Sequence, residues 1–374
     1  MRGAAGRKLG AVGVAWLLVL IAAVTGWWVF QPTLHDPTDN DLTLVYIGAR
    51  IGLEHGWSHV YSLALQHQLF AQLRPQMPFG DGERFLSPPP MAWLIVPLTA
   101  LGAAGAFYAW TAVSLAALVA AWWLAAPSEG LARALWLLGA LAWYPVQYSL
   151  SLGQPAMIVL LAVATCWKLA DAGRPYLAGA ALGLSVVKPQ LSLVLPVVLL
   201  VAGHWRIAAG WGIAVAILAG LSVIVIGPQG IGDYRSLMTE AQMVTNNRYF
   251  TLAYVLGPGV LSYVAAAAVV AVGLVGAYLN RGAGLSRLFA LGLITTTLSA
   301  TYWHLQDFTI LVMAAWLFWR DTRSNWQRAW LLVVAFAGEL AWPVSPLPIL
   351  IAVAVWLAFL VVPSQTRLAS AAAL

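Results

Sequence analysis

The sequence predicts an all-α, polytopic integral membrane protein, and three observations lead to that class. Hydrophobic residues make up 61% of the 374 residues and charged residues only 9%, far below the roughly 25% charged of an average soluble domain. Apolar runs long enough to cross about 30 Å of hydrocarbon recur along the chain. The chain also has 20 tryptophans, and indole rings favour the membrane–water interface. We expect one transmembrane domain over residues 1–374.

Charge and cysteine content exclude several partners. The sequence pI is about 9.6, but the basic residues are scattered along the chain, a pattern that membrane topology explains better than nucleic-acid binding. Cys166 is the single cysteine, which excludes a disulfide framework or a thiolate metal site. We expect membrane lipids as neighbours and no nucleic-acid partner.

Apolar segments predict about twelve membrane crossings. They lie near residues 10–31, 104–126, 132–150, 155–171, 174–187, 189–203, 206–227, 258–280, 285–301, 305–319, 327–343 and 346–362. The first follows a basic head, as in a signal peptide. However, Trp27, Trp28, Val29 and Phe30 stand where a cleavage site would need small residues, so we favour a retained anchor.

The distribution of basic residues predicts that both termini are cytoplasmic. With the N-terminus inside, the inside loops carry Arg2, Arg7, Lys8, Arg133, Lys168, Arg174, Arg206, Arg281, Arg287, Arg320, Arg323, Arg328 and Arg367. Only six basic residues fall in the outside loops or within the membrane: Arg50, Arg74, Arg84, Lys188, Arg235 and Arg248. We expect the plasma (inner) membrane as the location.

Two long polar excursions, residues 32–103 and 228–257, then face outward. The first contains the apolar stretch "SPPPMAWLIVPLTALG" (87–102), which is short and carries four prolines. Counting it as a crossing would invert the charge asymmetry of every later loop. We predict a juxtamembrane helix on the outer face, and re-entry into the bilayer stays open.

The stretch "HDPTDNDL" concentrates three carboxylates directly after the first span. Helical spacing after Asn40 predicts a helix start, where an aspartate has a structural explanation as a cap. The functional alternative is a carboxylate that accepts a proton from an alcohol at the mouth of a membrane cavity. We favour Asp41 as that base, Asp39 as a cap or helper, and Asp36 as merely solvated.

Lys188 lies between two unusually short apolar segments that meet at "VVKPQLS". A snorkelling lysine is the ordinary explanation. The short segments give it little route to either interface, and an ionisable residue at depth is a site hypothesis. Gln154, in the outside turn "SLSLGQPAM", either serves a tight connection or presents an amide to the same cavity.

"SATYWHLQDFTI" brings His304 and Asp307 together at positions i and i+3 on the outside. The pair resembles half a metal site, but neither HExxH nor DxD completes one, so we expect no metal and no cofactor. His304 is either a hydrogen-bonding site residue or an interface histidine. Arg235, Tyr234, Arg248 and Tyr249 could engage a polar head group, although each alone is more typical of a solvated or interfacial residue.

These elements, in this order, resemble the polyprenyl-phosphate-dependent mannosyltransferases of glycosyltransferase family 87, within the GT-C fold class. The motifs are "DLTLVYIGA", "GWSHVY", "FLSPPPMAWLIVPLTALG", "LGQPAM", "LAGAALGLSVVKPQ" and "SATYWHLQDFTIL". They cover roughly residues 10 to 320. Val45 and Tyr46 replace the paired aromatics common after the acid, and Ala300 stands where proline is frequent before the histidine.

The resemblance implies an inverting hexosyltransferase, with mannose as the expected sugar, that acts on the outer face of the cell-envelope membrane. Its expected partners are a polyprenyl-phosphate sugar donor and a lipid-linked or glycan acceptor, as in glycolipid biosynthesis. Asp41 would be the catalytic base, with His304 also catalytic, near the donor. The expected substrate-binding residues are Lys188, Gln154, Asp39, Tyr46, Asp307 and Arg248.

Two other classes remain as alternatives. A secondary transporter or lipid flippase is compatible with twelve spans and a buried lysine, but such proteins often carry inverted repeats, and no internal repeat is evident here. A non-catalytic assembly subunit would give no covalent product and would not depend on Asp41.

Overall fold

All regular secondary structure is helical in residues 2–363, the part of the chain that the computed structural model describes. The α-helices are α1 (Arg2–His35), α2 (Asp41–His55), α3 (Leu63–Leu73), α4 (Pro89–Ile95), α5 (Gly102–Ala125), α6 (Gly130–Ala142), α7 (Tyr144–Ser151), α8 (Ala156–Asp171), α9 (Pro175–Gly183), α10 (Leu195–Val201), α11 (Trp205–Met243), α12 (Ala253–Leu256), α13 (Val260–Leu279), α14 (Leu285–Ser299), α15 (Leu311–Asp321), α16 (Asn325–Leu340) and α17 (Leu347–Val361). The 3₁₀ helices are η1 (Trp57–His59), η2 (Val96–Leu101), η3 (Leu184–Val187), η4 (Pro189–Leu191), η5 (Thr245–Arg248) and η6 (Leu305–Ile310). The predicted all-α class is confirmed. Arg367, one of the basic residues predicted to be cytoplasmic, lies outside the described residues.

Every apolar segment predicted from the sequence falls on helix, but fewer helices than twelve are long enough to cross a membrane alone. Within residues 2–363, four candidates pass by length and composition: Leu9–His35, Pro89–Ala125, Trp205–Met243 and Val260–Leu279. α7 and α8 make a fifth if they are counted as one span bent by 118°. The other predicted crossings are shorter, because helices of 7–16 residues rise only about 10–24 Å at 1.5 Å per residue. Four or five helices are therefore long and apolar enough to be candidate spans, and twelve crossings stays a prediction.

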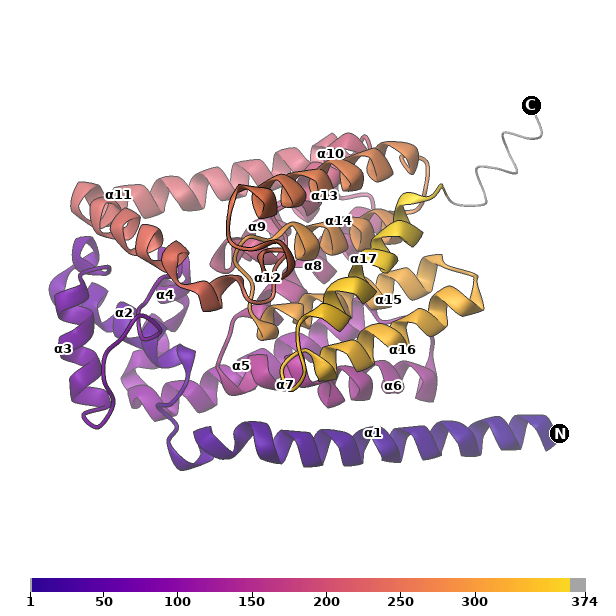
Figure 1. The fold of residues 1–374 in the computed structure, drawn as a ribbon, viewed down its shortest axis with the longest axis horizontal. Helices are drawn as coiled ribbons and strands as arrows, with labels where there is room; N and C mark the ends of the chain where they lie inside the picture. The colour runs from indigo at the N-terminus through magenta and orange to yellow at the C-terminus, as the bar shows by residue number, and fades with distance from the viewer. Residues whose placement is uncertain (1, 364–374) are drawn as a thin grey trace.

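α1 runs along one side of the bundle, where it touches α6 and α7 (Figure 1). Its apolar side chains are exposed along most of its length, as expected of a helix that faces lipid. The start of α1 and the end of α17 lie at the same end of the bundle (Figure 1). That placement agrees with termini on one side of the membrane.

The apolar stretch 87–102 forms helix, and its predicted place at the outer membrane surface stays a prediction. α4 buries Pro89, Pro90, Met91, Ala92 and Ile95 inside the protein and packs against α2. η2 then connects α4 directly to α5. The prolines stand in the first turn of α4 and η2, where a missing N–H costs no hydrogen bond.

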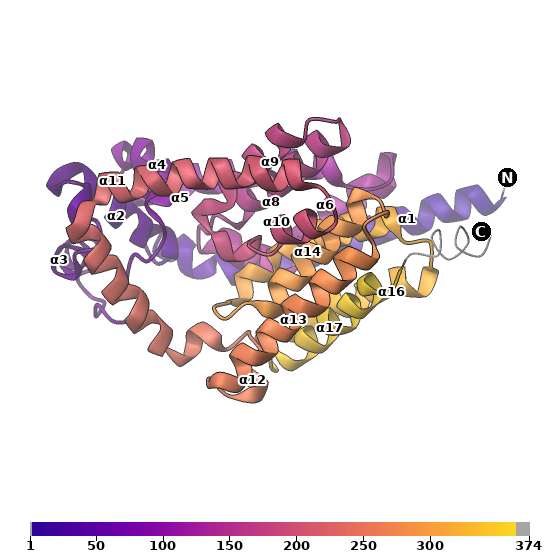
Figure 2. The ribbon, with the colours of Figure 1, turned by 90° about the horizontal axis from the view of Figure 1, so that it is seen from above.

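The second excursion, predicted as residues 228–257, is largely helical. α11 turns sharply at Gly227, whose φ of 63° lies in the left-handed region, and resumes at Pro228 (Figure 2). Its second half lies against the first excursion. Arg84 pairs with Glu240, and Gln229 Nε2 lies 3.1 Å from His59 Nδ1.

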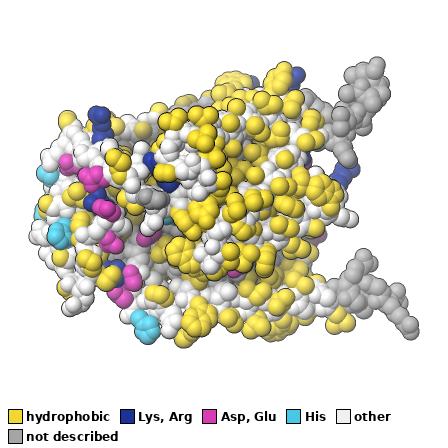
Figure 3. Space-filling view, in the orientation of Figure 1, with side chains coloured by type: hydrophobic (Ala, Val, Ile, Leu, Met, Phe, Trp, Pro, Cys, Tyr) yellow, Lys and Arg dark blue, Asp and Glu magenta, His cyan; other side chains and the backbone are white. Residues whose placement is uncertain are grey.

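The two excursions thus form one polar end of the bundle, made of α2, α3, α4 and residues 228–243. Figure 3 shows acidic, basic and histidine side chains gathered there, whereas hydrophobic side chains cover most of the rest of that face. This distribution is typical of a protein with an apolar band that faces lipid and a polar end that faces water.

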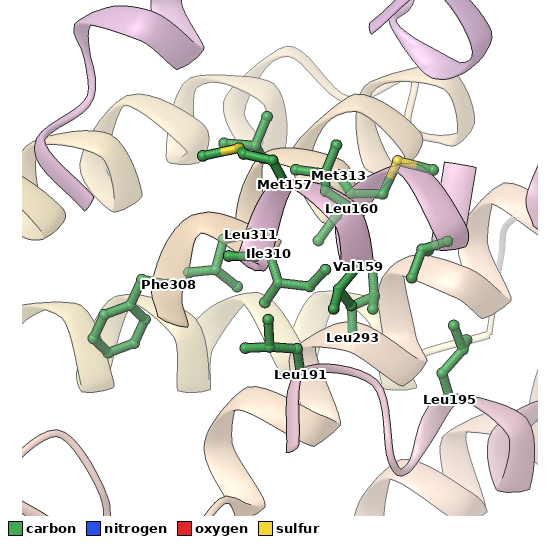
Figure 4. Packing of buried hydrophobic residues seen from close by; sticks show 14 of the residues in the cluster. Met157, Val159, Leu160, Leu191, Leu195, Leu293, Phe308, Ile310, Leu311 and Met313 are labelled. Atoms are coloured by element: carbon green, nitrogen blue, oxygen red, sulfur yellow. The ribbon is translucent and has the colours of Figure 1, made fainter. Parts of the chain in front are cut away.

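The hydrophobic core extends from this end through the rest of the bundle. Figure 4 shows side chains from α8, η4, α10, α14, η6 and α15 interlocked, among them Met157, Leu191 and Phe308. α9 and α11 approach closely through glycines: a Cβ on Gly179 would overlap the Ile207 carbonyl and the Trp211 amide. Small residues at such crossings let helix backbones touch.

Candidate active site

Asp41 is the first residue of α2, and its neighbour Asn40 is the helix cap. The Asn40 side chain accepts a hydrogen bond from the Thr43 N–H, 3.2 Å away. The predicted helix start after Asn40 is therefore confirmed. Because Asn40 performs the capping, the Asp41 carboxylate is free for another partner.

That partner comes from the turn between α7 and α8. Gly153 adopts a φ of 66°, and the backbone N–H of Leu42 donates to the Leu152 carbonyl at 3.1 Å. This contact brings the start of α2 against the turn. The Gln154 side-chain amide then donates to Asp41 Oδ2.

Lys188 lies between η3 and η4 and is 8% exposed. Its ammonium donates to Gln154 Oε1 at 2.6 Å and pairs with the Asp307 carboxylate, which is fully buried. The single Gln154 side chain thus joins the carboxylate of Asp41 to the ammonium of Lys188. An ammonium has three donors, and these two contacts occupy two of them.

The far end of this network is the irregular segment between α14 and η6. The backbone N–H of His304 donates to Asp307 Oδ2 at 3.1 Å, and His304 Nε2 lies 3.1 Å from Asn247 Oδ1. Asn247 also accepts the Trp303 N–H at its backbone carbonyl, 3.1 Å away. Asn247 in η5 and Asp307 in η6 therefore both hold His304.

Burial sets the protonation of the two groups that could exchange protons. The pKa of Asp41 is raised, chiefly because burial removes water from the carboxylate; Gln154, His304 and Lys188 offset part of this effect. The pKa of His304 is lowered, again chiefly by burial. Asp41 is thus a stronger base than an exposed aspartate, and His304 is neutral at pH 7.

Five of the predicted site residues therefore lie in one continuous network, which we call the Asp41–His304 network: Asp41, Gln154, Lys188, Asp307 and His304. Three of the five lie within three residues of core side chains labelled in Figure 4. Gln154 is three residues before Met157, Lys188 three before Leu191, and Asp307 directly precedes Phe308.

Three other predicted residues make their contacts elsewhere. Asp39 pairs with Arg74 at 2.9 Å. Tyr46 is 4% exposed, and its hydroxyl lies 3.4 Å from the Thr99 carbonyl. Arg248 donates to the Pro258 carbonyl at 3.0 Å, and its guanidinium lies over the Tyr263 ring.

The prediction that Asp36 is merely solvated is wrong. Asp36 Oδ1 accepts hydrogen bonds from the Thr38 hydroxyl and N–H, at 2.6 and 2.9 Å, and Arg74 approaches Oδ2 at 3.5 Å. The hydrogen bonds from Thr38 are the main reason that the pKa of Asp36 is lowered. Asp36 and Asp39 thus fasten the chain before α2 to α3.

Two residues that the sequence reading passed over belong to the site. Asn247 contacts His304, and the Tyr302 ring packs edge-on against the His304 ring with centroids 4.9 Å apart. The polar run "TNNRY" and the aromatic before "WHLQD" were the available signals. No group of three or more His, Cys, Asp or Glu side chains able to hold a metal ion is found among the described residues.

A helical, largely apolar chain that joins Asp41, Lys188, Asp307 and His304 in one buried network is typical of a membrane-bound enzyme. The model of glycosyltransferase family 87 matches residues 85–346, and the chain belongs to that family. It is therefore a membrane glycosyltransferase, and the predicted family is confirmed. The matched range contains Gln154, Lys188, His304 and Asp307, whereas Asp41 precedes it. The searches of curated proteins and of solved structures found no match.

Proposed function

We propose that the enzyme transfers a hexose, with mannose as the expected sugar, from a polyprenyl-phosphate donor to a hydroxyl of a lipid-linked or glycan acceptor. One observation carries the proposal: Gln154 holds the Asp41 carboxylate and the Lys188 ammonium at the two ends of its amide. Such a site places a base for the acceptor beside a positive charge for the donor.

The proposed step is an inverting displacement. The acceptor hydroxyl gives its proton to Asp41, and its oxygen forms a bond to the anomeric carbon. The bond from that carbon to the phosphate oxygen breaks, and the electron pair leaves with polyprenyl phosphate. General-base help is worth about 10²–10⁴-fold, and fixed positive charge at the leaving oxygen acts in the same direction.

Lys188 is the proposed phosphate partner because its ammonium has three donors and contacts only Gln154 and Asp307 among the described residues. Asp307 orients the ammonium, and Gln154 orients both Lys188 and Asp41. His304, neutral and held by Asn247, is the proposed catalytic contact to the donor sugar and phosphate. If His304 were the base instead, activity would fall as pH drops through the pKa of His304, which burial holds below its ordinary value.

Asp39, Tyr46 and Arg248 are not retained as substrate contacts, because their side chains are engaged outside the Asp41–His304 network. We propose a GT-C-like architecture in which the shorter helices complete about twelve crossings. The positive-inside rule places the termini in the cytoplasm and the polar end on the outer face of the plasma (inner) membrane.

The test uses the purified full chain in proteoliposomes. Polyprenyl-phosphate [³H]mannose and GDP-[³H]mannose are supplied separately, together with a lipid extract as acceptor. Label should enter a new glycolipid only from the polyprenyl donor, because the catalytic groups face the lipid-fed side. Transfer from GDP-mannose alone, or label that moves across the bilayer without a new covalent product, would overturn the proposal.

A further inference from the structure

A cavity of about 400 Å³ opens where the end of α8 meets the starts of α9, α11 and α14. Its volume is within the roughly 300–1,000 Å³ of ordinary small-ligand pockets. Small or apolar residues form most of its wall: Ala170, Gly173, Pro175, Gly203, Ile207 and Leu285. The proposed reaction makes no use of this cavity.

Two helices separate the cavity from the Asp41–His304 network. α8 begins two residues after Gln154 and carries Ala170 in its last turn, whereas α14 begins at Leu285 and ends five residues before His304. With 16 and 15 residues, these helices rise about 24 and 22 Å. The cavity is therefore a separate feature at the other end of the bundle, the end that the positive-inside rule places in the cytoplasm.

Arg206 supplies a cation at the cavity wall. Its side chain is exposed, and its guanidinium lies 5.5 Å from the centroid of the Trp205 ring. It forms no ion pair with a carboxylate within residues 2–363. Because a planar guanidinium presents several donors that match the oxygens of a phosphate, a phosphate in the cavity would gain this partner without breaking an existing pair.

The charges around the cavity favour an anion. Lys168, in the last turn of α8, and Arg174, directly before α9, are exposed at the same end as Arg206. Asp171 is the carboxylate that stands among them. Burial lowers the pKa of His204, so this ring on the cavity wall is neutral at pH 7 and adds no charge. Three cations against one carboxylate leave a positive excess.

The surroundings of the cavity are those of a membrane interface. Trp205 and Tyr176 are 52% and 48% exposed, and their rings meet edge to face with centroids 6.1 Å apart. Indole and phenol rings gather at the boundary between hydrocarbon and water. Leu177 on α9 and Leu200 on α10 continue the exposed surface with apolar side chains. A phosphate bound here would thus have room for acyl chains beside it.

We infer that the cavity binds the head group of an anionic phospholipid, with the phosphate on Arg206 and the acyl chains along the exposed apolar side chains of α9 and α10. Basic pockets between membrane helices select anionic head groups in this way. Because α8, α9, α11 and α14 meet at the cavity, the bound lipid stabilises their packing. The inference is independent of the donor and acceptor of the reaction.

The test follows thermal unfolding of the full chain in detergent, titrated with phosphatidylglycerol or with phosphatidylcholine of the same acyl chains. A ligand that binds the folded state raises the Tm as its concentration rises, so phosphatidylglycerol should act at lower concentration than phosphatidylcholine. Arg206→Gln should weaken the apparent affinity for phosphatidylglycerol roughly fivefold, as expected for loss of one arginine at the head group. Arg281→Gln is the matched control, because Arg281 is also exposed over an aromatic ring, that of Tyr278, but does not line the cavity. It should keep the wild-type affinity.

A second variant separates the cavity from surface charge. Ala170→Leu fills the cavity and leaves Arg206 in place, so it should also weaken the binding of phosphatidylglycerol, whereas general attraction to a basic surface would not change. Glycerol phosphate carries the anionic group without acyl chains and should not raise the Tm at the concentrations at which the lipid acts. Equal effects of the two lipids, equal weakening by Arg206→Gln and Arg281→Gln, wild-type affinity in Ala170→Leu, or an equal effect of glycerol phosphate would each overturn the inference.

Discussion

Substitution of Asp41 by asparagine is the sharpest test of the mechanism. Asparagine has nearly the same shape and keeps an oxygen that accepts from Gln154, so the Gln154–Lys188–Asp307 contacts should persist. Only the ability to accept a proton is lost. The expected fall in kcat is about 10²–10⁴-fold, or about 2.7–5.4 kcal/mol of barrier at about 1.36 kcal/mol per tenfold.

The assay follows transfer of label from polyprenyl-phosphate [³H]mannose in proteoliposomes, with the donor KM measured alongside. The donor KM should change little, because Lys188 is untouched. Asp39→Asn is the matched control, since Asp39 pairs with Arg74 away from the network, and it should retain kcat within about threefold. A fall of less than tenfold for Asp41→Asn would refute Asp41 as the base and favour His304.

Three further predictions concern charge, packing and pH. Lys188→Met should raise the donor KM. It should also lower stability by about 3–5 kcal/mol, because the buried Asp307 carboxylate loses its ion-pair partner. Adding Asp307→Asn should recover much of the thermal stability, and an unchanged Tm in the single variant would contradict the buried pair. Gly179→Ala should destabilise the fold by about 1–3 kcal/mol, because the new Cβ meets backbone atoms of α11. Gly212→Ala is the control and should not destabilise it, because Gly212 has open space around it. Equal thermal unfolding of the two variants would contradict the close crossing of α9 and α11. Burial raises the pKa of Asp41 above its ordinary 3.8, so kcat/KM should fall as pH drops through that raised value. The same shift means that the stability Asp41 contributes is present at low pH and is lost as pH rises through the raised pKa. Asp41→Asn should accordingly unfold at an equal or higher temperature than wild type at neutral pH, and a lower Tm would count against the burial argument.

The residues that sequence reasoning could find are those whose chemistry conflicts with their surroundings. A lysine within an apolar run and a carboxylate at a helix start after the first span both stand out locally, and the structure joins them through Gln154. Asn247 could not be found in this way. Its partner His304 lies 57 residues further along the chain, and nothing in a single sequence reports contacts between irregular segments.

Helix boundaries were less predictable where the same residue types can either end a helix or start a further one. "GPQG" reads as the end of a span, yet Gly227 supplies the left-handed turn and Pro228 starts a further helical stretch, because proline is well accommodated in a first turn. Similarly, the packing of "SPPPMAWL" against α2 depends on tertiary contacts that hydropathy does not encode. Asp36 was misjudged because its main partner, Thr38, lies only two residues further along the chain and its local hydrogen bonds were overlooked; Arg74 is brought close only by the fold.

Because α9 and α10 are short, the activity of the enzyme should depend on the thickness of the bilayer around it. With nine and seven residues, these helices rise only about 14 and 11 Å, so the Lys188 ammonium between them is held at a fixed depth set by the protein. A thicker bilayer would raise the plane of the lipid head groups relative to that depth, and a thinner one would lower it. In proteoliposomes whose acyl chains differ only in length, the donor KM should therefore vary with chain length, while Lys188→Met should lose that dependence. Acyl-chain length would then act as a regulator of this glycosyltransferase without any ligand binding to it.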